Sequence, residues 1–327
     1  MTLRRRTLLT ALAAAALALP GAGWAQDFPN RAVTIYVPFT AGGPTDAITR
    51  IVAEGMSRQL GQPVVVENAT GAGGTIAAAK TAQAKPDGYS LLMHHIGLAS
   101  TATLYRKLPF SVTESFAPLG LVSEAAMTLV ARPDFPAADL AGLMAAIKTE
   151  GDKLNLGHSG LGGANHLCGM LIQHAAGKSV TGVPYRGSAP ALTELTAGRL
   201  DIFCDQATNT VPFIKDARIK AYAVTSRARV PGLDGLPTTA EAGQPSILMT
   251  TWHGLYAPKG TPEPVQERLS AALRAALKDA SLRERFAKIV TEPAADERAT
   301  PAYHRQFLAE EVARWRPIIE AAGQYAD

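Results

Sequence analysis

The sequence predicts an α/β fold. Short apolar runs that suit buried strands alternate with segments whose apolar residues recur at helix spacing. This alternation indicates mixed, mostly parallel sheets that are covered by helices on both faces. The chain has 327 residues, a length typical of about two domains.

The strands are expected wherever a short apolar run lies between turn residues. They cover residues 32–37, 64–67, 89–94, 119–122, 127–131, 154–157, 181–184, 201–204, 219–224 and 252–257. Apolar residues at helix spacing predict helices within residues 48–60, 265–277 and 303–319, and further helices are expected between residues 139 and 154, between 157 and 181 and between 184 and 201. The capping-box sequence from Thr238 to Glu241 predicts one more helix start.

Residues 1–25 are predicted to be a signal peptide. Arginines at positions 4–6 precede an apolar run over residues 8–19, which is shorter than the roughly 20 residues of a membrane span. Small residues before the end of the segment predict cleavage after Ala25, and hence a periplasmic protein. The arginines also fit a twin-arginine signal, so the export route stays open.

The charge of the mature chain argues against two kinds of partner. Loss of the leader leaves 29 of the 32 basic residues against 28 acidic ones, without a run of lysine or arginine. Phosphate contacts require a concentrated basic face, so neither nucleic acid nor a membrane surface is an expected partner.

Cys168 and Cys204 are expected to be buried, unpaired thiols. A mature chain of this size buries enough apolar surface to fold without a disulfide, and free cysteine is among the most buried residue types. The two residues form no metal motif, whereas a disulfide in an oxidising compartment remains the alternative.

Three glycine-rich turns, at residues 38–46, 159–166 and 184–190, join a predicted strand to a predicted helix. Ligands of α/β proteins collect at such turns, because backbone amides and the helix dipole converge there. Asp46 is either a first-turn acid that the helix dipole stabilises or a ligand contact. Arg186 either binds a ligand carboxylate through two parallel hydrogen bonds or is a charged residue on the rim of the ligand site.

The motifs of common enzymes are missing from the sequence. Residues 71–76 begin like a dinucleotide loop but end in isoleucine, and residues 157–161 begin like a nucleophile elbow but lack its closing glycine. There is no Walker A or H-E-x-x-H sequence, and the histidines are scattered. We therefore expect no catalytic residue, no metal and no cofactor, although His95 lies near a strand end where it could line a pocket.

Several segments, in order along the chain, resemble the Bug or tripartite tricarboxylate transporter (TctC-like) receptors. They are residues 38–46, 159–167, 183–187, 198–201, 237–243 and 252–262. The resemblance implies a type II-like periplasmic binding protein of two lobes that close like a Venus flytrap. The implied first lobe covers residues 26–124 and 226–327, and the second covers residues 125–225.

The resemblance also implies that backbone amides, small hydroxyls and waters hold a small carboxylate. Together with the loops, it predicts these ligand-binding residues: Phe39, Thr40, Ala41, Gly42, Gly43, Thr45, Asp46, His95, Ser159, Gly162, Gly163, Asn165, His166, Arg186, Gly187 and Asp205. Gly163 departs from the serine that many relatives carry. The implied function is a monomeric solute receptor that delivers its ligand to membrane permease subunits of a tripartite transporter, and a sensory receptor that presents its bound form to a signalling partner is the alternative.

Overall fold

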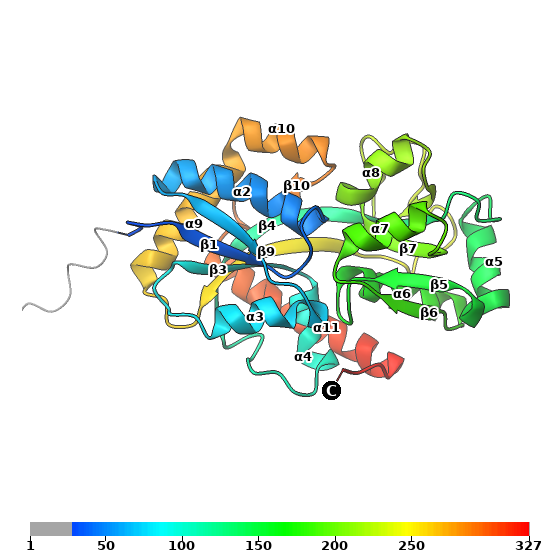
Figure 1. Cartoon of the computed structure of the whole chain (residues 1–327), viewed down its shortest axis with the longest axis horizontal. Coiled ribbons are helices and arrows are strands. Elements are labelled where there is room, and N and C mark those ends of the chain that lie inside the picture. The colour runs from blue at the N-terminus through cyan, green and yellow to red at the C-terminus, as the bar shows by residue number, and fades with distance from the viewer. Residues whose placement is uncertain (1–27, 327) are drawn as a thin grey trace, which may run out of the picture.

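The computed structural model describes residues 28–326 and divides them into two α/β lobes that share one curled sheet (Figure 1). In the first part of the chain the elements are β1 (Val33–Val37), α2 (Pro44–Leu60), β2 (Val64–Asn68), α3 (Thr75–Ala82), β3 (Ser90–His95), α4 (Gly97–Leu104) and β4 (Phe116–Ala131). The middle part holds α5 (Leu140–Glu150), β5 (Asn155–His158), α6 (Ala164–Ala176), β6 (Thr181–Pro184), α7 (Ser188–Thr196), β7 (Ile202–Gln206), α8 (Ala207–Lys215) and β8 (Lys220–Val224). The last part holds β9 (Thr250–Pro258), α9 (Glu263–Lys278), α10 (Ala280–Lys288), β10 (Glu292–Pro293) and α11 (Pro301–Ala322).

The strand order is β2-β1-β3-β9-β4-β7-β5-β6, and both β8 and β10 also pair with β4. Strands β1, β2 and β3 pair in parallel in the first lobe, as do β5, β6 and β7 in the second. Every pair that involves β4 or β9 is antiparallel. The sheet is therefore mixed as predicted, but it is not mostly parallel, because five of the nine strand pairings among the described residues are antiparallel. The antiparallel part lies at the centre, where β4 passes from one lobe to the other.

Strand β4 corrects the prediction of two separate strands over residues 119–122 and 127–131. It runs without interruption over 16 residues, and all but one of them are buried. Its pairing with β9 shifts register near Gly120 and again near Ser123. These bulges let the strand continue through residues that break the apolar pattern, so the sequence suggested a gap where the backbone has none.

Two further predictions differ from the structure. Thr238 and Glu241 exchange the two hydrogen bonds of a capping box, with N···O distances of 2.8 and 3.1 Å between donor and acceptor, but only a turn follows them. Helices α3, α4, α8 and α10 were not expected, and Pro212 lies inside α8. The remaining predicted strands and the three long helical segments coincide with observed elements to within a few residues.

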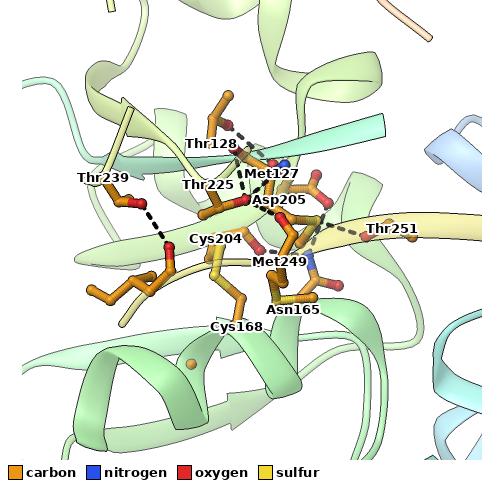
Figure 2. Close-up of a disulfide and its surroundings, with 12 residues drawn as sticks. Met127, Thr128, Asn165, Cys168, Cys204, Asp205, Thr225, Thr239, Met249 and Thr251 are labelled. Atoms are coloured by element: carbon orange, nitrogen blue, oxygen red, sulfur yellow. Dashed lines mark hydrogen bonds between the residues drawn. A yellow bond between two sulfur atoms is a disulfide. The ribbon is translucent and has the colours of Figure 1, made fainter. Parts of the chain in front are cut away.

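The two cysteines form a disulfide, which overturns the expectation of free thiols (Figure 2). Cys168 on α6 and Cys204 on β7 are fully buried, and their Cα atoms lie 6.1 Å apart. The preference for free thiols rested on burial, which is correct, but burial alone cannot tell whether two distant cysteines meet. The bond joins a helix to the strand beneath it within the second lobe.

No helix within residues 28–326 is long and apolar enough to cross a bilayer. The predicted signal peptide, residues 1–25, lies outside the described residues.

Candidate ligand-binding cleft

The three glycine-rich turns meet between the lobes. A Cβ atom on Gly187 of the second lobe would lie 3.0 Å from the backbone nitrogen of Thr40 in the first. A Cβ atom on Gly160 of the second lobe would lie 2.8 Å from the Cα atom of Gly73 in the first. Glycines therefore allow backbone from the two lobes to touch at two places, and the lobes are closed on each other.

Three helices begin at these turns, and each has glycine as its N-cap. The N-caps of α2, α6 and α7 are Gly43, Gly163 and Gly187, and none of these three helices has a side-chain cap. Helices α5, α10 and α11 begin with side-chain caps from Asp139, Asp279 and Thr300, whereas α3, α4, α8 and α9 also lack one. Amides in a first helical turn have no partner within the helix, so the uncapped starts present free donors and positive dipole ends.

In Figure 1 the dark-blue start of α2 lies beside the green second lobe. The predicted amides of Gly42 and Gly43 already have acceptors, since Gly42 N donates to Asp46 Oδ2 at 3.0 Å and Gly43 N to the Thr40 carbonyl at 3.3 Å. The free donors of α2 are consequently the next amides, those of Thr45 and Asp46.

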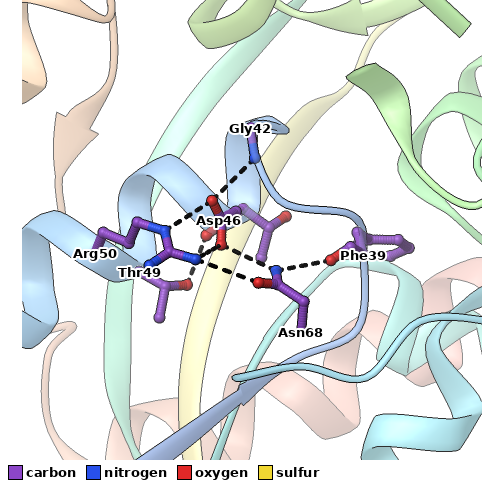
Figure 3. Close-up of polar contacts among 7 residues, drawn as sticks. Phe39, Gly42, Asp46, Thr49, Arg50 and Asn68 are labelled. Carbon is purple, nitrogen blue, oxygen red and sulfur yellow. Dashed lines mark hydrogen bonds and ion pairs between the residues drawn. The ribbon is translucent and has the colours of Figure 1, made fainter. Parts of the chain in front are cut away.

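The carboxylate of Asp46 organises the first turn (Figure 3). It accepts both Nε and a terminal nitrogen of Arg50 at 2.9 Å, and Asn68 Nδ2 donates to it at 2.9 Å. Asn68 also donates to the carbonyl of Phe39, which ties β2 to the turn. Burial opposes the charge of Asp46, but the hydrogen bonds from Arg50, the Gly42 amide and Asn68 hold its pKa below the ordinary value. Neutralised by Arg50, Asp46 shapes the turn without repelling an anion at the start of α2.

Asp205 has the corresponding position in the second lobe, at the end of β7. Its Oδ1 accepts from Asn165 at 2.8 Å and from Ser188 at 2.9 Å, and its Oδ2 accepts from Asn209 at 2.6 Å. Burial raises its pKa, and these three hydrogen bonds oppose that rise. The carboxyl group therefore holds together the starts of α6, α7 and α8.

Ser159 occupies the space that a side chain at position 163 would need. Its hydroxyl donates to Asn165 Oδ1 at 2.7 Å, and a Cβ atom on Gly163 would collide with this hydroxyl oxygen. Asn165 in turn donates to the carbonyl of Cys204 at 2.7 Å, next to the disulfide. Glycine at position 163 thus leaves the Ser159 hydroxyl room to bond Asn165.

His95 is buried behind Phe39 in the first lobe. Its ring stacks on Phe39 with centroids 4.6 Å apart, and its Nδ1 accepts the amide of Gly97 at 2.9 Å. Burial holds the pKa of His95 well below its ordinary value, so the ring is neutral near pH 7. Thr45 lies against the buried ring of His253, since its hydroxyl contacts His253 Nε2 at 3.2 Å.

The structure does not bring every predicted residue to the same place. Ala41 and Gly42 are exposed, and Arg186 is exposed on the rim of an interlobe groove of about 550 Å³ that also includes Ser159 and Tyr105. His166 and Gly162 lie on the far side of the 159–163 turn, where they bond each other and the first lobe. Phe39, Thr40, Gly43, Thr45, His95, Ser159, Gly163, Asn165, Gly187 and Asp205 are buried or half-buried around the contact between the lobes. Their contact with a ligand remains a prediction.

Sequence reasoning missed three polar residues of this region: Ser188, Asn209 and Gln324. Ser188 is the first residue of α7, after its N-cap Gly187, and its hydroxyl donates to Asp205. Asn209 lies one helical turn after Asp205, a spacing that would have indicated the bond had α8 been foreseen. Within the described part of the chain, no group of three or more His, Cys, Asp or Glu side chains could hold a metal ion.

Comparison with known proteins supports one family. A family model for the tripartite tricarboxylate transporter family receptor matches residues 48–324. A protein of Agrobacterium vitis, described as a UPF0065 protein in the TAR-I ttuE-ttuC' intergenic region, is 46% identical over 307 residues, which are 94% of this chain and 89% of that protein.

Two solved structures are also similar. The periplasmic binding protein BugD is 41% identical with a TM-score of 0.89, over 92% of this chain and 100% of its own. MatC (Rpa3494) from Rhodopseudomonas palustris, solved with bound malate, is 37% identical with a TM-score of 0.87, over 89% of this chain and 100% of its own.

Proposed function

Because the chain belongs to the tripartite tricarboxylate transporter family of receptors, we propose that it binds a small aliphatic dicarboxylate between its lobes and delivers it to the membrane permease of such a transporter. The proposed location is the periplasm, after cleavage near Ala25, and the proposed working form is a monomer without catalytic activity. The similar protein MatC was solved with malate, which supports C4 dicarboxylates as the first candidates to test.

The uncapped starts of α2, α6 and α7 carry this proposal. They bring main-chain donors from both lobes to one place, and helix N-termini favour anions. Hydrogen bonds to a charged group contribute roughly 1.5–3 kcal/mol each, so four of them give roughly 6–12 kcal/mol before the costs of closing and ordering. Micromolar affinity requires about 8 kcal/mol, so no arginine in the cleft is required.

The hydroxyl of Thr40 supports the same position. Its Oγ1 is buried at the contact with Gly187, and among the described residues it has no hydrogen-bond partner. Buried hydroxyls normally have one. A carboxylate or an ordered water between the lobes would supply the missing acceptor or donor.

We also propose where the chain crosses between the lobes. The first crossing lies within β4, next to the predicted boundary at residues 124–125. For the second crossing, residues 226–249 contact the second lobe, since Thr239 N donates to the carbonyl of Val224 at 2.9 Å and Met249 N to that of Thr225 at 3.1 Å. This favours a crossing at the start of β9 over the boundary expected at residues 225–226.

The closed arrangement makes Gly187→Ala informative. We expect this variant to raise the dissociation constant for L-malate by about 5- to 100-fold, because the added methyl group collides with Thr40 only when the lobes are closed. The stability of the ligand-free protein should change little, since the backbone of Gly187 is extended. Isothermal titration calorimetry measures the affinity, and Gly235→Ala is the control because nothing lies within 4 Å of its added Cβ. Equal affinities in the two variants would contradict closure at Gly187.

The proposed ligand class is tested with the mature protein after removal of any co-purified ligand. Thermal shift and calorimetry are run with L-malate, succinate, adipate, citrate, L-aspartate and benzoate. We expect saturable binding of an aliphatic dicarboxylate, a scattering profile that becomes more compact, and recovery of the acid unchanged. If only benzoate, only citrate or only the amino acid L-aspartate binds, and L-malate, succinate and adipate do not, the proposed ligand class is wrong. Turnover of the acid would show that the protein is an enzyme.

Transport is tested separately from binding. A strain that lacks the receptor but keeps the permease should lose uptake of the bound acid, and the intact gene should restore it. Uptake that persists in this strain would instead favour the sensory alternative.

A further inference from the structure

A single histidine connects the ligand loop of the second lobe to the C-terminal end of the first. His166 Nδ1 accepts the amide of Gly162 at 3.3 Å, and His166 Nε2 lies 2.9 Å from Oε1 of Gln324. We propose that the His166–Gln324 hydrogen bond is a latch between the lobes that stabilises the closed, ligand-holding state. This inference rests on the proposed function, because it concerns how the same cleft stays closed.

The hydrogen bonds determine the protonation of the ring. Because Nδ1 accepts an N–H, it carries no proton, so the proton of the neutral ring must lie on Nε2 and is donated to Gln324 Oε1. The ring is buried among groups that keep it neutral: burial and the neighbouring His158, with ring centroids 5.2 Å apart, lower the pKa of His166 to about 4. One imidazole thus bonds the ligand loop through one nitrogen and the other lobe through the second.

Gln324 belongs to the first lobe. Helix α11 packs against α4 and β4, and the chain after it is fixed to the end of α4, since Ala326 N donates to the carbonyl of Leu104 at 2.8 Å and Arg106 N to that of Ala326 at 3.1 Å. In Figure 1 the red end of α11 reaches beneath the green second lobe. Opening of the lobes would therefore carry Gln324 away from His166.

Two neighbouring bonds hold the same loop from the first lobe. Ser100 Oγ on α4 donates to the carbonyl of Gly162 at 2.9 Å, and the hydroxyl of Tyr105 donates to that of Leu161 at 3.2 Å. The N–H and the carbonyl of Gly162 are therefore both engaged on the side away from the cleft. The bonds from Ser100 and Tyr105 hold the carbonyls of this loop, just before the start of α6, only while the lobes are closed, whereas His166 holds the Gly162 N–H from within the second lobe.

Gln324 is a favourable test residue because its side chain is exposed, so its loss should leave folding intact. Gln324→Ala removes the acceptor, whereas Gln324→Glu keeps an acceptor oxygen at the same place. Glu320→Ala, one turn earlier on the exposed side of α11, is the matched control. A neutral hydrogen bond of this kind corresponds to about a 2- to 10-fold change in the closing equilibrium.

The closing equilibrium is measured by the distance between spin labels on Lys215 of α8 and Glu267 of α9, with and without L-malate, and L-malate affinity is measured by calorimetry. We expect Gln324→Ala to lower the closed fraction and to raise the dissociation constant by the same 2- to 10-fold. Gln324→Glu should recover most of the closed fraction and most of the affinity. Glu320→Ala should match the wild type in both measurements. Nitrogen chemical shifts of the His166 ring should show a proton on Nε2 in the wild type. Exchange of this ring proton should be altered in Gln324→Ala.

The latch and the proposed function fail in different ways. If the wild type binds no carboxylate, the proposed function is wrong, while the label distance in the ligand-free protein still tests the latch. If Gln324→Ala keeps both the wild-type distance distribution and the wild-type affinity, the latch is wrong although the receptor function stands. A ring proton on Nδ1 in the wild type would also overturn it.

Discussion

Lowering the pH from about 7.5 to about 5 is expected to reduce the free energy of unfolding by up to about 8 kcal/mol, because buried histidines resist protonation. Six of the seven histidines are buried, and burial lowers the pKa of His94 and His166 to about 4 and that of His253 and His304 to about 3. In the unfolded chain each histidine titrates near its ordinary pKa of about 6.5.

The direction follows from proton linkage. Below about pH 6.5 the unfolded state binds protons that the folded state does not, so each of the four histidines contributes a loss of about 2 kcal/mol by pH 5. The loss continues until the pH reaches the folded-state pKa values of about 4 and 3. Carboxylates with a lowered pKa, such as Asp46, destabilise the fold only in a more acidic range.

Urea unfolding at both pH values measures this effect. His304→Asn should reduce the pH dependence of the unfolding free energy by about one proton, because asparagine does not titrate. Asparagine can still accept the Gly120 amide, which now bonds His304 Nδ1 at 3.3 Å. His174→Asn is the control, because His174 is exposed. An unfolding free energy that is equal at the two pH values would show that the buried rings do not set the acid sensitivity.

Reduction of the Cys168–Cys204 bond should lower the free energy of unfolding by about 4 kcal/mol, according to the chain-entropy relation for cross-links. The bond spans a sequence separation of 36 residues, all in the second lobe. The bond also lies beside Asn165, which donates to the Cys204 carbonyl and to Asp205 (Figure 2). Loss of the bond should therefore loosen the start of α6 and weaken ligand binding.

The measurement compares urea unfolding of the wild type with and without a strong reductant. Cys168→Ala is the control, since it has no disulfide to reduce and should give the same midpoint under both conditions. If the wild type also unfolds at one midpoint in both conditions, the bond contributes nothing to stability. Loss of two hydrogens in the intact mass before reduction confirms that the bond is present.

Local sequence patterns predicted most of the fold, because burial repeats with the period of each element. The strand at residues 181–184 and the helical segment at 265–277 are examples that coincide with β6 and α9. Patterns failed where tertiary contacts overrule them: register shifts carry β4 past Gly120, and the capping box at Thr238 starts no helix. The cysteine pair was missed for a related reason, since no local signal shows that α6 lies on β7.

The candidate cleft was predictable in part. Glycine-rich turns after strands indicated loops that the structure brings to the contact between the lobes, because strand ends gather at one edge of a sheet. The partners of individual groups were not predictable: Asn68 completes the Asp46 network from 22 residues away, and Gln324 reaches His166 across 158 residues. Such contacts depend on how helices pack in three dimensions, which a single sequence does not encode in any short pattern.

The glycine N-caps have a consequence for how this protein can be studied and how it can change. If main-chain amides bind the ligand, an alanine scan removes none of those donors and will under-report the site. It will identify instead the residues that hold the turns in shape, such as Asp46 and Asp205. By the same reasoning, substitutions in the walls around the turns could change which acid is bound without any change in the turns themselves.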